Sequence, residues 1–119
     1  PNLWPMTGKT GAVRLAVAAG APLIPIAQWG DHEILAPYSK FLKPFPRKVV
    51  TLQCGQAIDL CKWQGKEDNP IAMEEATQFA MKELARMVGE LRNEAPPAEL
   101  FDIRKSDLPR TGNFKKNKK

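Results

Sequence analysis

One long amphipathic segment limits the possible folds of this chain more than any other feature. Its apolar residues recur at spacings of three and four, which is the period of a helix with one buried face. Asn69 stands at an N-cap position and Pro70 suits the first turn, so we predict a helix over residues 70–92. We expect the buried stripe to consist of Met73, Ala76, Ala80, Leu84, Met87 and Leu91. Such a stripe needs a second layer to cover it.

A shorter helix is predicted near the start of the chain, over Gly11–Ala19. Thr10 can cap its N-terminus, and Gly20 stands where a left-handed C-terminal cap belongs. The start of this helix is a generic anion site, to which Lys9 adds a positive charge. The alternative is an ordinary capped helix beside a solvated lysine.

Two strands are predicted between these helices. Residues 21–28 are apolar and β-branched like a buried strand, but Pro22 and Pro25 cannot donate to a ladder. We therefore expect a strand start, an edge strand or an interrupted strand. Residues 48–54 form the clearest strand, which Gly55 ends. The order helix, strand, strand, helix predicts an α/β fold.

Positive charge is concentrated at the C-terminal end. The formal net charge is +5. From Arg104 onward there are seven basic residues and one acidic residue, which gives 7 − 1 = +6 and leaves 5 − 6 = −1 for the rest. We divide the chain into a domain, residues 1–95, and a basic tail, residues 96–119, expected to be disordered. The tail suits contact with anionic lipid headgroups or nucleic acid, and the alternative is a solubilising terminus.

Composition excludes several kinds of site. His32 is the single histidine, so a histidine-rich metal centre is impossible. Cys54 and Cys61 are spaced neither as a zinc knuckle nor as a redox pair, and we expect reduced thiols and no cofactor or metal. No run of about 18 apolar residues is present, so no segment is predicted to span a membrane.

The stretch Gly8-Lys9-Thr10 looks like the end of a nucleotide-binding loop. That motif needs a glycine five positions before the Gly-Lys pair, where Leu3 stands. It also needs a preceding strand, and two prolines among the first five residues make residues 1–5 a poor strand. A nucleotide loop is therefore not expected here.

Two neighbouring motifs, "KTGAVRLA" at residues 9–16 and "APLIPI" at residues 21–26, resemble the later part of the 1-acylglycerol-3-phosphate acyltransferases. In that family a lysine-bearing helix start leads into a strand with the pattern apolar-P-apolar-apolar-P-apolar, which residues 21–26 match throughout. The strand that ends at Gly55 also looks like the family's, although Ala57 stands where the family often has proline. The resemblance covers roughly residues 1–60 and implies a mixed-sheet acyltransferase domain.

The resemblance implies acyl transfer from acyl-CoA or acyl carrier protein to lysophosphatidate, giving phosphatidate in phospholipid biosynthesis. In the family, the histidine of an H-x-x-x-x-D motif removes the hydroxyl proton and the aspartate orients it. Pro37 occupies that aspartate position after His32, which also follows the proline-rich strand, so His32 is not this base. The F-P-E-G-x-R phosphate motif is absent too. We expect the chain to be the C-terminal part of such an enzyme, without catalytic residues of its own.

Five residues are assigned to substrate binding by this resemblance. Lys9, Thr10 and Gly11 would lie near the acceptor's phosphate, at a helix N-terminus. Pro22 and Pro25 would leave carbonyls and apolar side chains open as a wall for the acyl chain, or would only end the pairing of an edge strand. The expected partners are the thioester donor, lysophosphatidate and an anionic membrane surface at the cytoplasmic face, and not nucleic acid.

A small basic nucleic-acid-binding module is the competing hypothesis, and a soluble scaffold fragment is a third. Binding of nucleic acid by the tail would need aromatic residues among the basic ones. The tail contains Phe101 and Phe114, but only Phe114 lies among its basic residues, and the rest of the chain is almost neutral. This hypothesis therefore ranks below acyl transfer.

Overall fold

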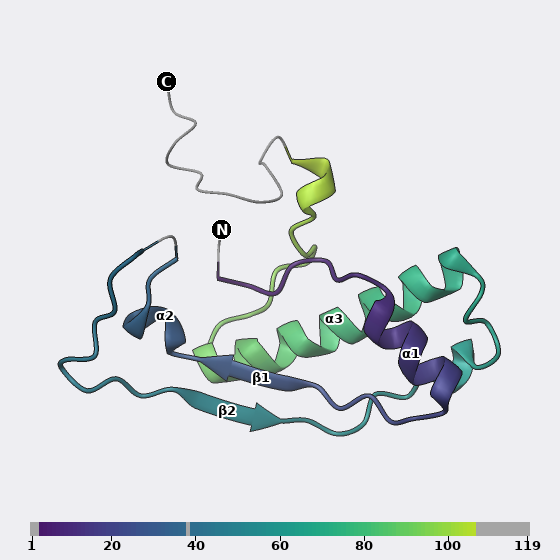
Figure 1. Ribbon diagram of the computed structural model, residues 1–119, viewed down its shortest axis with the longest axis horizontal. Coiled ribbons are helices and arrows are strands. Elements are labelled where there is room, and N and C mark those ends of the chain that lie inside the picture. Colours follow the sequence, from purple (N-terminus) through teal and green to yellow (C-terminus); the bar gives the residue numbers. More distant parts are fainter. Residues whose placement is uncertain (1–2, 38, 107–119) are drawn as a thin grey trace.

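Helices and a small antiparallel sheet make up the computed structural model, which describes residues 3–37 and 39–106 (Figure 1). The elements in chain order are α1 (Gly11–Ala19), β1 (Ile26–Trp29), α2 (Asp31–Ile34), β2 (Thr51–Cys54), the 3-10 helix η1 (Cys61–Trp63), α3 (Pro70–Arg92) and the 3-10 helix η2 (Ile103–Lys105). The fold is α/β in the general sense. The predicted order of helix, strand, strand and helix is confirmed, with short helical turns added between.

The long helix α3 forms where the sequence predicts it. The Asn69 side chain accepts hydrogen bonds from the N–H groups of Ile71 and Ala72, at 3.0 and 3.2 Å. These bonds satisfy two of the donors that a helix start leaves without an intrahelical partner. The predicted stripe faces the rest of the chain: four of its members are buried and two are partly buried, namely Met73, Ala76, Ala80 and Met87, and Leu84 and Leu91.

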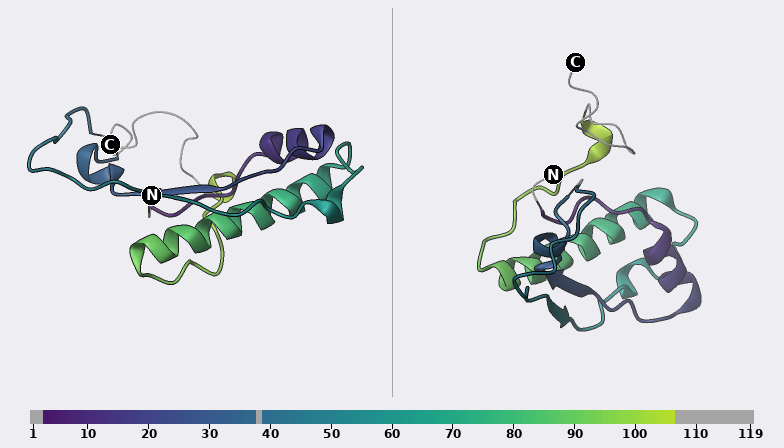
Figure 2. Two further views of the ribbon diagram at one scale, coloured as in Figure 1. Left: turned by 90° about the horizontal axis from the view of Figure 1, so that it is seen from below. Right: turned by 60° about the vertical axis from the view of Figure 1, so that its left-hand side comes forward.

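The chain is arranged as two layers, with α3 in one layer and α1 with the sheet in the other (Figure 2). The first half of α3 packs Met73 and its neighbours against Val13 and Val17 of α1 and against Trp63 of η1. The second half packs Met87 and Val88 against Ala27 of β1. One helix therefore carries both apolar clusters, because it is long enough to pass under α1 and β1 in turn.

The sheet has two strands, β1 and β2, paired antiparallel from Ile26–Cys54 to Trp29–Thr51. Before β1, a single bridge joins Leu23 to Ile58. The segment predicted as a strand over residues 21–28 is thus interrupted and becomes regular only after its second proline. The strand predicted over residues 48–54 begins later than expected, at Thr51.

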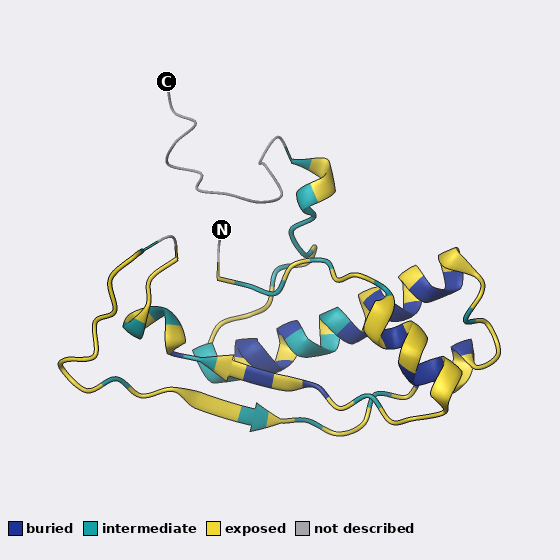
Figure 3. Cartoon of the chain, viewed as in Figure 1, coloured by how far each residue is buried: buried dark blue, intermediate teal, exposed yellow. Residues whose placement is uncertain are grey.

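Only one face of the sheet is covered. Alternate side chains of β1 point to opposite faces, so Ala27 is buried against α3 while Ile26 is exposed. Ile24 before β1 and Leu52 of β2 are exposed as well. The outer face of the two strands therefore carries exposed apolar side chains, with Gln28 and Cys54 between them, and no described residue buries it. The exposed residues of both strands are yellow in Figure 3.

Residues 96–106 return to the body of the molecule. The Thr7 N–H donates to the Phe101 carbonyl oxygen at 3.0 Å, and the Arg104 guanidinium pairs with Glu74 of α3 at 3.0 Å. This packing differs from the expectation of a disordered tail from residue 96 onward, because the ion pair and the backbone bond attach the segment at two points. The remainder of the expected tail, residues 107–119, lies outside the described residues.

Candidate functional site

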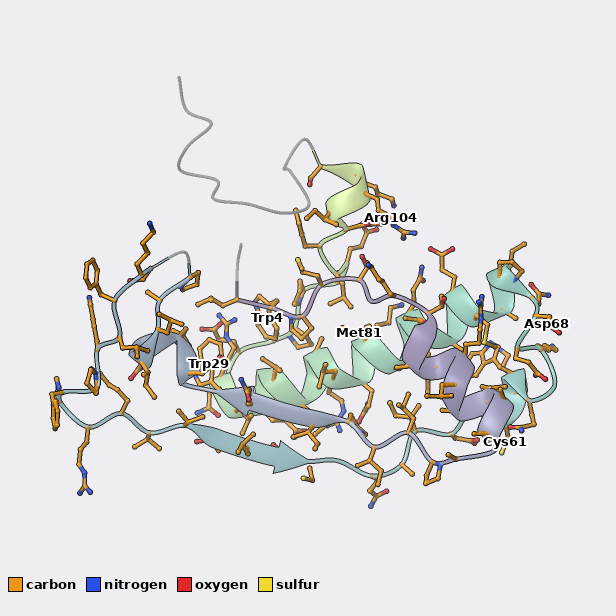
Figure 4. All side chains as sticks on the ribbon, in the orientation of Figure 1. Trp4, Trp29, Cys61, Asp68, Met81 and Arg104 are labelled. Atoms are coloured by element: carbon orange, nitrogen blue, oxygen red, sulfur yellow. The ribbon has the colours of Figure 1, made fainter. Side chains whose placement is uncertain are left out.

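The segment that carries Lys9 lies tightly against α3. A Cβ placed on Gly8 would stand 3.1 Å from Met81 and from the methyl group of Thr77, so a larger residue would have to displace them. Figure 4 shows Met81 on α3 where the N-terminal segment passes it. The Thr7 bond to Phe101 holds the same segment from the C-terminal side. Lys9 is therefore presented from a fixed backbone, while its own side chain is exposed.

The start of α1 presents free hydrogen-bond donors. The first helical bond runs from the Arg14 N–H to the Thr10 carbonyl, at 2.9 Å. No described residue accepts a hydrogen bond from the N–H groups of the three residues between them, Gly11, Ala12 and Val13. A Cβ on Gly11 would meet nothing within 4 Å, so this end of the helix is open. Lys9, Thr10 and Gly11 thus lie together around a small anion-binding surface.

Thr10 does not cap α1 with its side chain, contrary to the sequence prediction. It occupies the N-cap position, but its φ and ψ of −72° and −6° are helical, and no cap hydrogen bond is formed. An N-cap residue normally has extended backbone angles, which direct its side-chain oxygen at the following N–H groups. The failure of the Thr10 cap leaves those donors available to a ligand. Gly20, by contrast, adopts the predicted left-handed conformation, with φ +61°.

Of the two roles considered for the prolines, an open carbonyl is wrong for Pro25. Its carbonyl accepts a hydrogen bond from the Gly55 N–H at 2.9 Å, and the Leu23 carbonyl accepts one from Ile58 at 2.8 Å. These carbonyls face the segment that follows β2, because antiparallel pairing uses the C=O of a residue even where proline lacks the N–H. Pro25 is buried and Pro22 is exposed. What remains open beside them is the apolar outer face, through the side chains of Ile24 and Ile26.

The five predicted binding residues form two groups rather than one. Lys9, Thr10 and Gly11 precede α1, whereas Pro22 and Pro25 follow its C-terminal end. The helix α1 stands between the groups, and its nine residues give it a length of roughly 14 Å at a rise of about 1.5 Å per residue. A ligand that touched both would need a polar end and an extended apolar part.

His32 lies at the opposite end of the molecule from α1, on α2. Its ring contacts the Trp29 ring in a tilted arrangement, with a centroid distance of 4.4 Å and an interplanar angle of 49°, and no described carboxylate accepts a hydrogen bond from it. The neighbouring Asp31 instead accepts from Gln28, at 3.1 Å.

Within residues 3–37 and 39–106, no three His, Cys, Asp or Glu side chains gather as a metal site. Cys54 and Cys61 are free and exposed.

An arginine held between two tryptophans was not predicted. The Arg92 guanidinium, at the end of α3, lies 4.3 Å from the Trp4 ring and 4.4 Å from the Trp29 ring. It also donates to the Leu3 carbonyl at 3.1 Å and pairs with Glu94 at 2.7 Å. The cluster joins the N-terminal segment, β1 and α3, and both tryptophans are labelled in Figure 4. The three residues are far apart in the sequence, so no local pattern indicates their contact.

Asp102 of the neighbouring C-terminal segment is already paired with a cation. Arg104 binds Asp102 at 2.9 Å as well as Glu74 at 3.0 Å. Hydrogen bonds from Arg104 lower the pKa of Asp102 to about 2.

Elsewhere, a hydrogen bond to Asp59 and its negative charge raise the pKa of the Cys61 thiol, which disfavours the reactive thiolate. Lys9 forms no ion pair with any described residue, so its charge is available to a ligand.

No family model, curated protein or solved structure matches this chain. No helix in the described part is both long enough and apolar enough to cross a membrane. The resemblance to acyltransferases thus has its basis in the motifs of residues 9–26 and in the strand ending at Gly55.

Proposed function

We propose that this chain forms the acceptor-binding part of a glycerophospholipid acyltransferase, which transfers an acyl group from a thioester to 1-acylglycerol-3-phosphate. The observation that carries the proposal is the exposed Lys9 beside the unbonded N–H groups at the start of α1. A phosphate monoester carries the charge and the acceptor oxygens that such donors bind. In this proposal Lys9, Thr10 and Gly11 hold the acceptor's phosphate.

The apolar outer face of the sheet supports the same assignment. The exposed Ile24 and Ile26 lie in the segment that follows α1, and Leu52, paired with Gln28 on the neighbouring strand, is exposed on the same face of the sheet. An acyl chain needs an apolar wall of this kind, and a lysophospholipid has a polar end joined to an extended apolar part. The length of α1, roughly 14 Å, is within the length of such a lipid.

In the proposed reaction, residues of this chain bind and orient the acceptor lipid. A different segment of the enzyme supplies the base that removes the hydroxyl proton. The sequence has no H-x-x-x-x-D motif, because Pro37 follows His32 at the required spacing. The donor is acyl-CoA or acyl carrier protein, and the enzyme would work at the cytoplasmic face of the membrane. The mixed-sheet acyltransferase fold is part of this proposal, with β1 and β2 as two of its strands.

The proposal is tested by the Lys9→Met substitution in an enzyme that contains both this chain and the segment with the catalytic base. The phosphate does not react, so its contact should be similar in the ground state and the transition state. Such uniform binding appears in KM more than in kcat. A charge-assisted hydrogen bond contributes about 1.5–3 kcal/mol, so kcat/KM for lysophosphatidate should fall roughly ten- to a hundredfold. The KM of the thioester donor should hardly change.

The matched control is Lys66→Met, which removes an exposed lysine that precedes α3. It should leave the acceptor KM unchanged, and Lys9→Arg should recover part of the loss because it restores the charge. This chain alone, incubated with lysophosphatidate and oleoyl-CoA, should give no phosphatidate. An unchanged acceptor KM in Lys9→Met would remove Lys9 from the site.

A further inference from the structure

The loop between α2 and β2, residues 35–50, exposes large apolar side chains beside basic ones. Phe41 is 80% exposed and Phe45 is 83% exposed, and Leu42 and Val49 are also open to solvent. Among them stand the loop's four basic residues, Lys40, Lys43, Arg47 and Lys48. The loop contains no acidic residue, so its formal charge is +4. None of the four forms an ion pair with a described residue.

This exposure belongs to a loop whose described residues, 35–37 and 39–50, contact the rest of the molecule near both ends. The Lys43 N–H donates to the Ile34 carbonyl at 2.8 Å, and the Ser39 N–H donates to the Ala36 carbonyl at 2.9 Å. At the other end, the Val49 carbonyl lies so close to Gly30 that a Cβ there would be 2.2 Å away. The loop extends beyond the sheet at the end of the molecule away from α1 (Figure 1).

We propose that this loop docks on an anionic lipid surface, with Phe41, Leu42 and Phe45 entering the interface and the basic residues contacting the headgroups. Exposed aromatic and aliphatic side chains beside lysine and arginine are the combination that such surfaces bind. The apolar groups lose contact with water, and the flanking cations are attracted by the negative surface potential.

Lipid is favoured over nucleic acid by the apolar groups themselves. Leu42 and Val49 have no ring to stack on a base, whereas a strand-binding surface presents aromatic rings along a groove. The loop also differs from the C-terminal residues 107–119, which carry five basic residues and one acidic residue, or 5 − 1 = +4. The two segments have the same formal charge, so they can be compared in one experiment.

The test is sedimentation of the protein with vesicles of phosphatidylcholine alone and with about a third of phosphatidylglycerol. The parent protein should bind the anionic vesicles only. Phe41→Ser/Phe45→Ser should weaken this binding about tenfold or more, because the two rings that would enter the lipid interface are removed. Lys40→Gln/Lys43→Gln/Arg47→Gln should weaken it by a similar factor at low salt. Removal of residues 107–119 should leave most of the binding in place at about 0.1 M salt, where long-range attraction is screened.

Two sets of controls keep surface chemistry matched. Leu15→Ser/Ile71→Ser removes apolar side chains that are 70% and 80% exposed on α1 and α3, and Lys66→Gln/Lys82→Gln/Lys105→Gln removes exposed lysines elsewhere. Both should bind like the parent protein. Circular dichroism would verify that each variant is folded.

Binding of the Phe41→Ser/Phe45→Ser variant equal to that of the parent would overturn the proposal. So would loss of binding after removal of residues 107–119 alone. If the loop variants lost affinity for a single-stranded oligonucleotide and kept their affinity for vesicles, the loop would be a nucleic-acid surface instead. The measurement involves no acyl transfer, so its outcome is separate from that of the Lys9→Met experiment.

Discussion

Both faces of the β1–β2 sheet carry apolar residues, but the two faces have opposite surroundings. On the face that α3 covers, β1 places the small Ala27, which is buried. On the open face, the larger Ile26 and Leu52 are exposed. A strand with apolar residues on both faces is typical of a sheet that is covered on both sides. The comparison shows that α3 accounts for only half of the apolar pattern in these strands, which is why the outer face is suited to an apolar ligand or a second layer.

The largest test of this comparison is a truncation on each side. Met73→Ala should lower the free energy of unfolding by about 2–5 kcal/mol, because Met73 is fully buried and its loss leaves a cavity. Leu52→Ala on the open face should change it by no more than about 0.5 kcal/mol. Urea denaturation followed by circular dichroism measures both. Equal losses would mean that the open face is covered in solution.

A second test concerns Gly30, which follows β1 at the end of the sheet and packs closely against a neighbouring segment. Gly30 has φ +104°, and an added Cβ would overlap the Val49 carbonyl. Gly30→Ala should cost about 1–2 kcal/mol for the left-handed backbone and about 1–3 kcal/mol more for the overlap. Gly65→Ala is the matched control, since its φ is +75° but nothing lies within 4 Å. Similar unfolding free energies for the two variants would show that the Val49 segment moves freely.

The N-termini of α3 and α1 allow a further comparison, because only α3 has a side-chain cap. Asn69→Ala removes both cap hydrogen bonds of α3 and should cost about 0.5–2 kcal/mol. Thr10→Ala removes no cap bond from α1 and should change stability by no more than about 0.5 kcal/mol. Thermal unfolding of the two variants measures both changes in stability. A large effect of Thr10→Ala would indicate that its hydroxyl caps α1 in solution.

The smallest expected effect is the pH dependence of the C-terminal attachment. The pKa of Asp102 is about 2, below its ordinary value of 3.8, because Arg104 donates hydrogen bonds to the carboxylate. A lowered pKa in the folded state stabilises the fold above the ordinary pKa, and this contribution is lost as the pH falls from about 4 to about 2. An NMR titration of the Asp102 carboxyl carbon should give the low pKa, and Arg104→Gln should bring it closer to 3.8. An Asp102 pKa unchanged by that substitution would contradict the pairing.

Local patterns predicted the helices well. The bounds of α1 and α3 match the predicted ranges, and the Asn69 cap forms as expected. The signals of helix periodicity, N-caps and left-handed glycine are read within a few residues, so they need no knowledge of distant partners. The strands were less accurate: residues 48–50 have strand-like side chains, but β2 begins only at Thr51 because β1 ends at Trp29 opposite it.

Of the candidate site, the sequence predicted the residues around Lys9 but not their geometry. Thr10 has the right side chain for a cap, yet its backbone is helical. An open carbonyl was one of two roles considered for Pro25, and pairing with Gly55 uses that carbonyl. In both cases the backbone conformation of the residue decided the outcome, and that conformation depends on how neighbouring segments pack.

By itself, the sequence determined the position of the helices, the interruption of the first strand by proline and the place of the basic residues. Each of these depends on the period of apolar residues, on the missing N–H of proline or on composition, all of which act locally. Only the tertiary structure decided which face of the sheet is covered, that Arg92 lies between Trp4 and Trp29, and that Phe41 and Phe45 remain in solvent. These features join residues far apart in the chain, and one helix of limited length can cover only one face of the sheet that it crosses.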